Sequence, residues 1–210
     1  MKRMGETQDC APARVPPART DGIGARLGVA LLVPAIAIVL HELGHYLSHL
    51  AFGYSNVSLS FSEVSIGPAP SDVNARLADG VSFAAGTAIS LSLALVALSK
   101  RIPSALAAAL AGFELLRAGL GVGIGISSKG VRALWGGVGE LRYLATAFEW
   151  PSTAGALLGF LEIGVPVVAV SLLVRRLPTG QRMRVVAPAV AGSIVGLALW
   201  LLVIGPVLLP

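Results

Sequence analysis

Long apolar runs separated by short polar connections make up most of the chain. Five runs, at about 24–50, 80–99, 103–125, 153–175 and 184–209, are each long enough to cross a hydrocarbon layer of roughly 30 Å as a helix that rises about 1.5 Å per residue. After the first run, Val57, Leu59 and Phe61 alternate with polar residues before a Gly-Pro break, which predicts a β-hairpin-like insertion over 57–68. The pattern predicts an all-α integral membrane protein with about five transmembrane helices and this short insertion.

Besides the hairpin-like insertion, two further segments fall outside the five runs. Residues 1–23 are rich in proline and arginine without apolar periodicity, which predicts a disordered basic cytoplasmic tail ahead of one polytopic membrane domain over 24–210. Residues 131–150 are less apolar and carry four charged side chains, so they form either an interfacial amphipathic helix or a helix packed inside the bundle.

Composition supports a membrane protein and argues against a nucleic-acid-binding one. Of the 210 residues 55% are hydrophobic and 13% charged, and the mean hydropathy is +0.79. The net charge is +5, but lysine and arginine flank the apolar runs and do not form one basic stripe. We therefore expect the lipid bilayer, and not nucleic acid, to be the surroundings of this chain. The one cysteine, Cys10, allows no intramolecular disulfide.

The distribution of basic residues predicts an orientation. If positive charge marks the cytoplasmic side, the N-terminus is cytoplasmic and the C-terminus external, in a multi-pass protein that we expect in the plasma membrane. The residues on which this prediction rests are Lys2, Arg3, Arg14, Arg19, Arg26, Lys100, Arg101, Arg175, Arg176, Arg182 and Arg184.

All three histidines of the chain lie at the end of the first apolar run, in VLHELGHYLSHLAFG. On a helix, His41 and His45 share a face, so both can direct a nitrogen at one ion, with Glu42 beside it. In such an H-E-x-x-H arrangement two neutral imidazoles hold Zn²⁺ and the glutamate takes a proton from water. With this composition the pattern would arise by chance roughly once in seven hundred such chains.

The alternative for these histidines is structural: they would lie where the helix leaves the membrane and reach toward water. Ionisable groups in an apolar helix are costly and generally functional, which favours the metal site. His49 continues the four-residue spacing, but lies about 12 Å along the helix from His41. It is therefore expected to support the site or to lie at the interface.

The segment HELGHYLSHLAFG resembles the zinc-site helix of the site-2 proteases, the M50-type intramembrane metalloproteases. The hairpin-like 57–68 and the small-residue helix GVSFAAGTAISLSLALVAL follow in the order that this family shows. The resemblance implies a zinc-dependent endopeptidase that cleaves transmembrane segments of other membrane proteins. It also implies that His41 and His45 bind zinc and that Glu42 is the catalytic base. Many members open their site toward the cytoplasm, whereas the charge distribution puts His41 toward the outer face.

The chain departs from that family at the third zinc ligand. The family takes this ligand from an aspartate in a later helix, but no aspartate follows Asp79 here. Among the later glutamates we favour Glu140, because GGVGELRYL places it in a glycine-rich approach to a helix near the family's position. Glu114 and Glu162 are the alternatives. Glu114 has Arg117 within helical reach, which predicts an internal ion pair.

Two other functions fit parts of the pattern. The missing aspartate favours a zinc-binding but non-proteolytic membrane regulator or scaffold derived from such a protease. A transporter that uses the histidines would need further polar residues along a path, and the five runs contain few. For the protease, the segment at 57–66 is expected to pair with an unwound substrate as an added β-strand.

Overall fold

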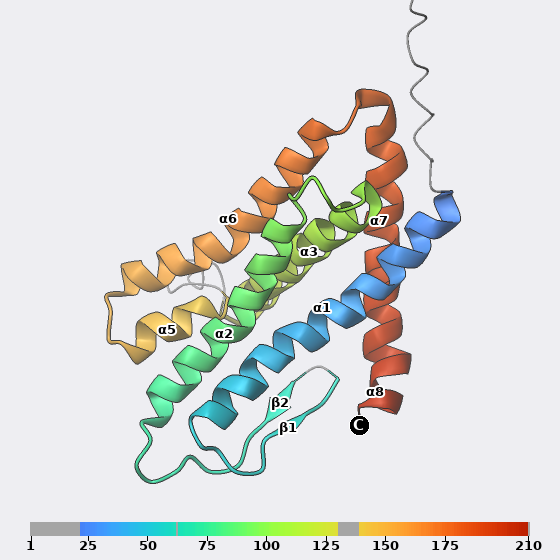
Figure 1. Ribbon diagram of the computed structural model, residues 1–210. Coiled ribbons are helices and arrows are strands. Elements are labelled where there is room, and N and C mark those ends of the chain that lie inside the picture. The colour runs from blue at the N-terminus through green and yellow to red at the C-terminus, as the bar shows by residue number, and fades with distance from the viewer. Residues whose placement is uncertain (1–21, 62, 130–138, 210) are drawn as a thin grey trace, which may run out of the picture.

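The computed structural model describes residues 22–61, 63–129 and 139–209. The predicted tail, apart from residues 22 and 23, and residues 131–138 of the less apolar segment lie outside this part of the chain. The long helices run up and down in one bundle (Figure 1); they are α1 (Ile23–Ala51), α2 (Ala75–Val96), α3 (Ser104–Lys129), α6 (Ser152–Arg176) and α7 (Thr179–Leu199). A π-helix, η1 (Trp200–Ile204), and the short α8 (Gly205–Leu208) continue α7.

Five helices in the described residues are long and apolar enough to span a membrane, as the sequence predicted. Their ends differ from the apolar runs because polar residues also take helical conformation. The second helix begins at Ala75 and not near 80, since the Asn74 side chain accepts a hydrogen bond from the Leu77 backbone N–H at 3.2 Å and caps the first turn. The last begins at Thr179, five residues before the run at 184.

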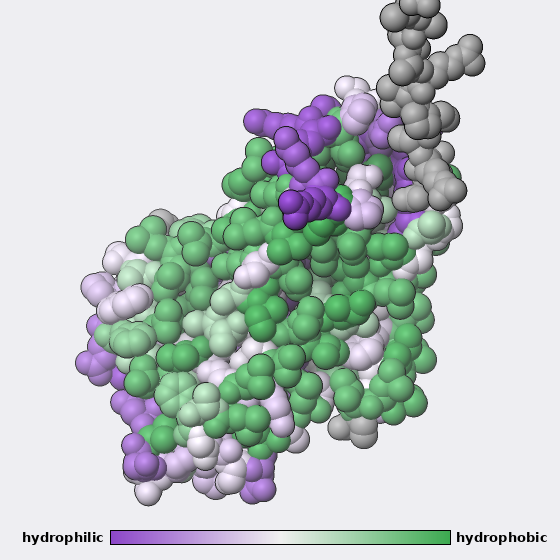
Figure 2. Space-filling view, viewed as in Figure 1, coloured by the Kyte–Doolittle hydropathy of each residue, from purple (hydrophilic) through white to green (hydrophobic). Residues whose placement is uncertain are grey.

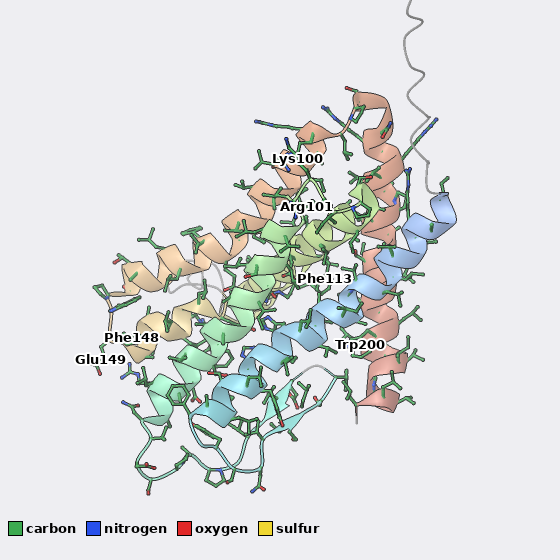
Figure 3. The ribbon with its side chains drawn as sticks, viewed as in Figure 1. Lys100, Arg101, Phe113, Phe148, Glu149 and Trp200 are labelled. Carbon is green, nitrogen blue, oxygen red and sulfur yellow. The ribbon has the colours of Figure 1, made fainter. Side chains whose placement is uncertain are left out.

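The surface of the bundle carries the apolar band that a membrane protein needs. In Figure 2 hydrophobic residues cover the middle of the molecule, and hydrophilic residues gather at its two ends. Large apolar side chains point outward on several helices, including Leu32, Leu157 and Leu202, which are 64%, 69% and 78% exposed. Lys100 and Arg101 lie at one end of the bundle and Glu149 at the other (Figure 3).

Small residues bring the helices close together. One buried cluster, at the meeting of α2, α3, α6 and α7, is made mostly of alanines. At the contact between α1 and α7, a Cβ on Gly192 would overlap the Ala30 side chain and one on Gly196 would overlap the Leu31 backbone. Without a hydrophobic driving force inside lipid, such close backbone packing is a main source of helix association.

The predicted insertion after α1 is a hairpin, shorter than the sequence suggested. Strands β1 (Ser58–Leu59) and β2 (Val64–Ser65) pair antiparallel, with Ser58 opposite Ser65 and Leu59 opposite Val64. The C-terminal helix holds the hairpin: Trp200 Nε1 donates to the Phe61 carbonyl at 2.9 Å, and the Phe61 N–H donates to the Leu209 carbonyl at 3.2 Å.

The described part of the segment 131–150 contains the seven-residue helix α5 (Leu141–Ala147). At about 1.5 Å per residue it is too short to cross a bilayer. It packs against α2 and α6, with Leu141 and Ala145 buried (Figure 1). Gly80 of α2 allows the approach, because a Cβ there would lie 2.9 Å from the Tyr143 carbonyl oxygen. This places the residue before the helix, Glu140, inside the bundle.

Candidate metal centre

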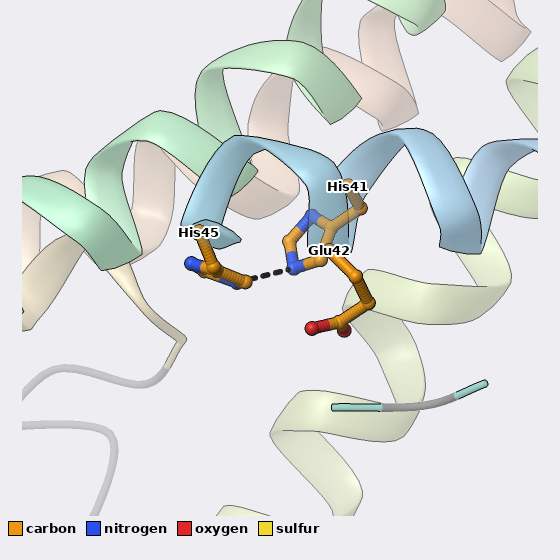
Figure 4. Close-up of side chains that lie close together, drawn as sticks. All are labelled: His41, Glu42 and His45. Atoms are coloured by element: carbon orange, nitrogen blue, oxygen red, sulfur yellow. Dashed lines mark hydrogen bonds between the residues drawn. The ribbon is translucent and has the colours of Figure 1, made fainter. Parts of the chain in front are cut away.

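Two imidazoles face one another in the second half of α1. His41 and His45 are 4% and 7% exposed, and their Nε2 atoms are 3.1 Å apart. The rings lie edge to face, with centroids 4.7 Å apart and an angle of 85° between the planes. Figure 4 shows the two rings and the Glu42 carboxylate on the same side of the helix. The i, i+4 spacing therefore produces the shared face that the sequence predicted.

The far sides of both rings are held by α2. His45 Nδ1 lies 2.8 Å from the Ser82 carbonyl oxygen, and His41 Nδ1 lies 3.0 Å from Ser90 Oγ. A carbonyl oxygen only accepts hydrogen bonds, so His45 Nδ1 must carry the hydrogen. In the neutral ring, Nε2 then presents a lone pair toward His41. Such contacts on the second ring nitrogen fix the tautomer and orientation of metal-binding histidines.

Glu140 brings a carboxylate to the same point. Its Oε2 is 3.2 Å from His41 Nε2 and 3.9 Å from His45 Nε2, and it accepts a 2.8 Å hydrogen bond from Thr87 Oγ1. Burial acts to raise the pKa of the Glu140 carboxyl, but the His41 hydrogen bond together with the charges of His41, Arg117 and His45 outweighs it and lowers the pKa to about 2. Glu140 is thus a carboxylate at neutral pH.

Two of the three separations between these atoms are close to those between the ligands of a tetrahedral zinc ion. Two ligand atoms, each about 2.0–2.1 Å from a tetrahedral zinc, lie roughly 3.3 Å apart. The separation of the two imidazole nitrogens, 3.1 Å, and the 3.2 Å from His41 Nε2 to Glu140 Oε2 are close to this value, and the third, 3.9 Å, is longer. Three groups with lone pairs directed at one point repel one another unless a proton or a metal ion lies between them.

Glu42 stands beside the two histidines. One ligand atom from each of His41, Glu42 and His45 can be chosen so that all lie within 4.8 Å of one another. Glu140 Oε2 also approaches both Nε2 atoms within 3.9 Å, so Glu140 and Glu42 each offer an oxygen to an ion between the two histidines.

Two cavities adjoin Glu42 and Glu140. The first, about 360 Å³, lies between α1, α3 and the α7–η1 helix, and its apolar lining is Ile38, Phe113, Leu120, Leu197 and Leu201. The second, about 290 Å³, lies toward the end of α1 and reaches the hairpin; its lining includes His45, His49, Glu63, Val64, Ser82 and Phe83. The candidate centre therefore has one apolar and one more polar neighbouring space.

Helix α2 shapes the site through residues that the sequence analysis did not identify. A Cβ on Gly86 would lie 2.5 Å from His45 Nε2, and one on Gly44 would lie 2.9 Å from the Gly86 backbone. Ser82, Thr87 and Ser90 are all buried. Their spacing, close to one helical face of an apolar span, is the signal that would have identified them, because buried hydroxyls in such helices find partners.

Glu114 and Glu162, the alternative third ligands, are buried but paired elsewhere. Arg117 Nε donates to Glu114 Oε2 at 3.0 Å, which confirms the predicted ion pair. Arg117 Nη1 is 3.8 Å from Glu162 Oε1. His49 is buried against the Tyr54 ring, with centroids 4.9 Å apart, and its Nδ1 has no hydrogen-bond partner among the described residues.

Comparisons with known proteins add no relative: no protein-family model, no curated protein and no solved structure matches the chain.

Proposed function

We propose that the chain is a zinc-dependent intramembrane endopeptidase that cleaves transmembrane segments of other proteins. One observation carries the proposal: two imidazole nitrogens and the Glu140 carboxylate converge within 3.9 Å inside an apolar bundle, with the Glu42 carboxylate beside them. Burying such groups together is costly, and a metal site accounts for that cost. His41, His45 and Glu140 would hold the ion.

Zinc in this position would act as a Lewis acid and lower the pKa of water near it. Glu42 then takes a proton from the water whose oxygen forms a bond to the peptide carbonyl carbon. When the carbon–nitrogen bond breaks, Glu42 gives that proton to the departing amine, so the products are a carboxylic acid and an amine. Ser82 and Ser90 hold both imidazoles in the orientation that this requires.

The cavities favour an apolar, extended substrate. The larger cavity has an apolar wall and reaches Glu42, so it suits a hydrophobic side chain next to the scissile bond. Val64 of the hairpin lines the other cavity, which brings a strand close to the site. A substrate helix must unwind before its peptide bond is accessible, and pairing with this strand would hold the unwound segment.

The basic end of the bundle supports a cytoplasmic N-terminus. The starts of α1, α3 and α7 and the ends of α2 and α6 share this end (Figure 1). Arg26 Nη1 donates to the Arg184 carbonyl there at 3.0 Å. His41 is 18 residues from Ile23, or roughly 27 Å along α1, and about 15 Å from Ala51. In this orientation the site lies nearer the external face, and the plasma membrane is the proposed location.

The Glu42→Gln variant tests the activity. Gln has nearly the same shape but cannot accept the proton, so cleavage of a transmembrane reporter should be abolished while one zinc per chain stays bound. The measurements are metal content of the detergent-purified protein and reporter cleavage in proteoliposomes. His41→Ala and His45→Ala are the matched variants that should lose both. Parent-like cleavage by Glu42→Gln would refute the assignment of the base.

The same experiment separates the proposed enzyme from a zinc-binding scaffold. A scaffold would keep zinc in the parent protein and cleave none of the reporters. A parent protein without zinc would instead favour a structural pair of histidines that share a proton. It would refute both the zinc protease and the zinc-binding scaffold.

A further inference from the structure

We propose that Glu162 is a positioning residue that fixes Glu140 in place as a ligand, with Arg117, which is itself paired with Glu114, holding Glu162 in turn. This inference rests on the proposed zinc site. It assigns a role to a buried group of charges, Glu114, Arg117 and Glu162, that the catalytic scheme does not use.

Glu162 contacts the backbone at Glu140, the proposed ligand; it does not contact the histidine nitrogens. Its Oε2 accepts hydrogen bonds from the Glu140 N–H at 2.9 Å and from the Leu141 N–H at 3.3 Å. These two amides begin α5, where the first N–H groups have no partner within the helix. Because α6 supplies the carboxylate, the start of α5 is tied to a transmembrane helix. The Glu140 side chain then leaves a fixed backbone toward α1.

Gly139 provides an independent observation of the same contact. Its φ is +89°, a conformation that L side chains rarely adopt, and a Cβ there would collide with the Glu162 carboxylate. The glycine therefore permits both the turn into Glu140 and the close approach of Glu162. In the sequence GGVGE, which ends at Glu140, Gly139 is the one glycine of three that lies within the described residues.

Arg117 stabilises the two buried carboxylates. Glu114 and Glu162 are 1% and 4% exposed, and the Arg117 guanidinium contacts both. A charge buried in this way needs an opposite charge and hydrogen bonds. The contacts form a continuous chain from α3 through α6 to the start of α5, and Thr87 of α2 holds the other end of Glu140. A ligand held on both sides keeps its geometry before the metal arrives.

Substituting Glu162 in two ways separates positioning from ion pairing. Glu162→Gln keeps an oxygen that can accept the two backbone N–H groups, whereas Glu162→Ala removes it. If Glu162 positions Glu140, Glu162→Ala should weaken zinc binding by about 10–100-fold and Glu162→Gln should stay within about threefold of the parent. Gly139→Ala, which displaces the Glu162 carboxylate, should resemble Glu162→Ala.

The measurements are zinc affinity by chelator competition and the visible absorption spectrum of the cobalt-substituted full-length protein. The spectrum reports coordination geometry directly, so a merely structural role would leave it unchanged. Glu149→Gln, an exposed glutamate at the other end of α5, and Gly164→Ala, in open space on α6, are the controls. Both should match the parent in affinity and spectrum.

Three results would overturn the proposal. Parent-like affinity and cobalt spectrum in Glu162→Ala would show that Glu140 needs no such support. If Glu162→Gln and Glu162→Ala lost zinc affinity equally, the charge of Glu162, and not its hydrogen bonds to the backbone, would be what zinc binding requires. Loss of zinc in Glu162→Ala with retention in Glu140→Ala would make Glu162 the ligand itself. If Glu162→Ala does not fold, the other two variants test the proposal. It then requires weakened zinc binding in Gly139→Ala and nearly unchanged zinc binding in Glu162→Gln. A parent protein that binds no metal would instead refute the zinc site.

Discussion

Adding one methyl group at Gly86 should displace His45, one of the proposed zinc ligands. A Cβ at this position in α2 would lie 2.5 Å from both Cε1 and Nε2 of His45. Favourable contact between such atoms begins at about 3.5 Å, so the imidazole must retreat by about 1 Å. Metal-ligand distances tolerate only about 0.2 Å. The His45 nitrogen would therefore leave its place in the site.

The expected effects of Gly86→Ala follow from this displacement. Zinc affinity should fall about 10–100-fold, and cleavage by roughly 100-fold, since a misplacement of about 1 Å in a catalytic group has that scale of effect. Overpacking should also lower the free energy of unfolding by about 1–3 kcal/mol. The assays are zinc competition, reporter cleavage and thermal unfolding in detergent.

Gly112→Ala is the matched control. It lies in α3 with nothing within 4 Å of the added Cβ, so zinc affinity should not change and stability should rise by at most about 1 kcal/mol. Parent-like zinc affinity in Gly86→Ala would refute the argument, because it would mean that the α1–α2 contact does not fix the ring.

Three further predictions concern the ligand, the orientation and the hairpin. Glu140→Ala should lose bound zinc in metal analysis, while Glu149→Ala, at an exposed glutamate outside the site, keeps it; retention in Glu140→Ala would leave a two-histidine site. In a Cys10→Ser background, a membrane-impermeant maleimide added to intact cells should label a cysteine at Ser71 but not one at Gln181, and the reverse pattern would invert the orientation. Leu59→Pro should slow reporter cleavage without loss of zinc, because proline removes a backbone donor from β1; unchanged cleavage would exclude strand pairing with substrate.

The sequence predicted the helices and half of the candidate centre, because both depend on local spacing. Apolar runs of membrane length and an i, i+4 pair of histidines need no knowledge of the tertiary structure. Glu140 was selected by elimination and glycine content, and the structure places its carboxylate against the histidines.

The remaining parts depend on which helices meet. Glu162 has no partner near it in the sequence, and its contact with the Glu140 backbone spans 22 residues. Ser90 reaches His41 from 49 residues away. The hairpin was overestimated because alternation continued through residues that face the C-terminal helix and do not pair as strands.

The close glycine contacts on α1 also limit the routes by which a substrate of the proposed enzyme would reach Glu42. Gly44 meets Gly86 on the α2 side, and Gly192 and Gly196 meet α1 on the α7 side, so backbone touches backbone on both flanks. Separating either pair of helices would require moving a whole transmembrane span. The apolar cavity is bordered by side chains instead, among them Leu120 and Leu201, which are 47% and 37% exposed. Rotamer changes of such residues take only nanoseconds, so for the proposed enzyme the side between α3 and η1 is the one from which a substrate would enter from the lipid.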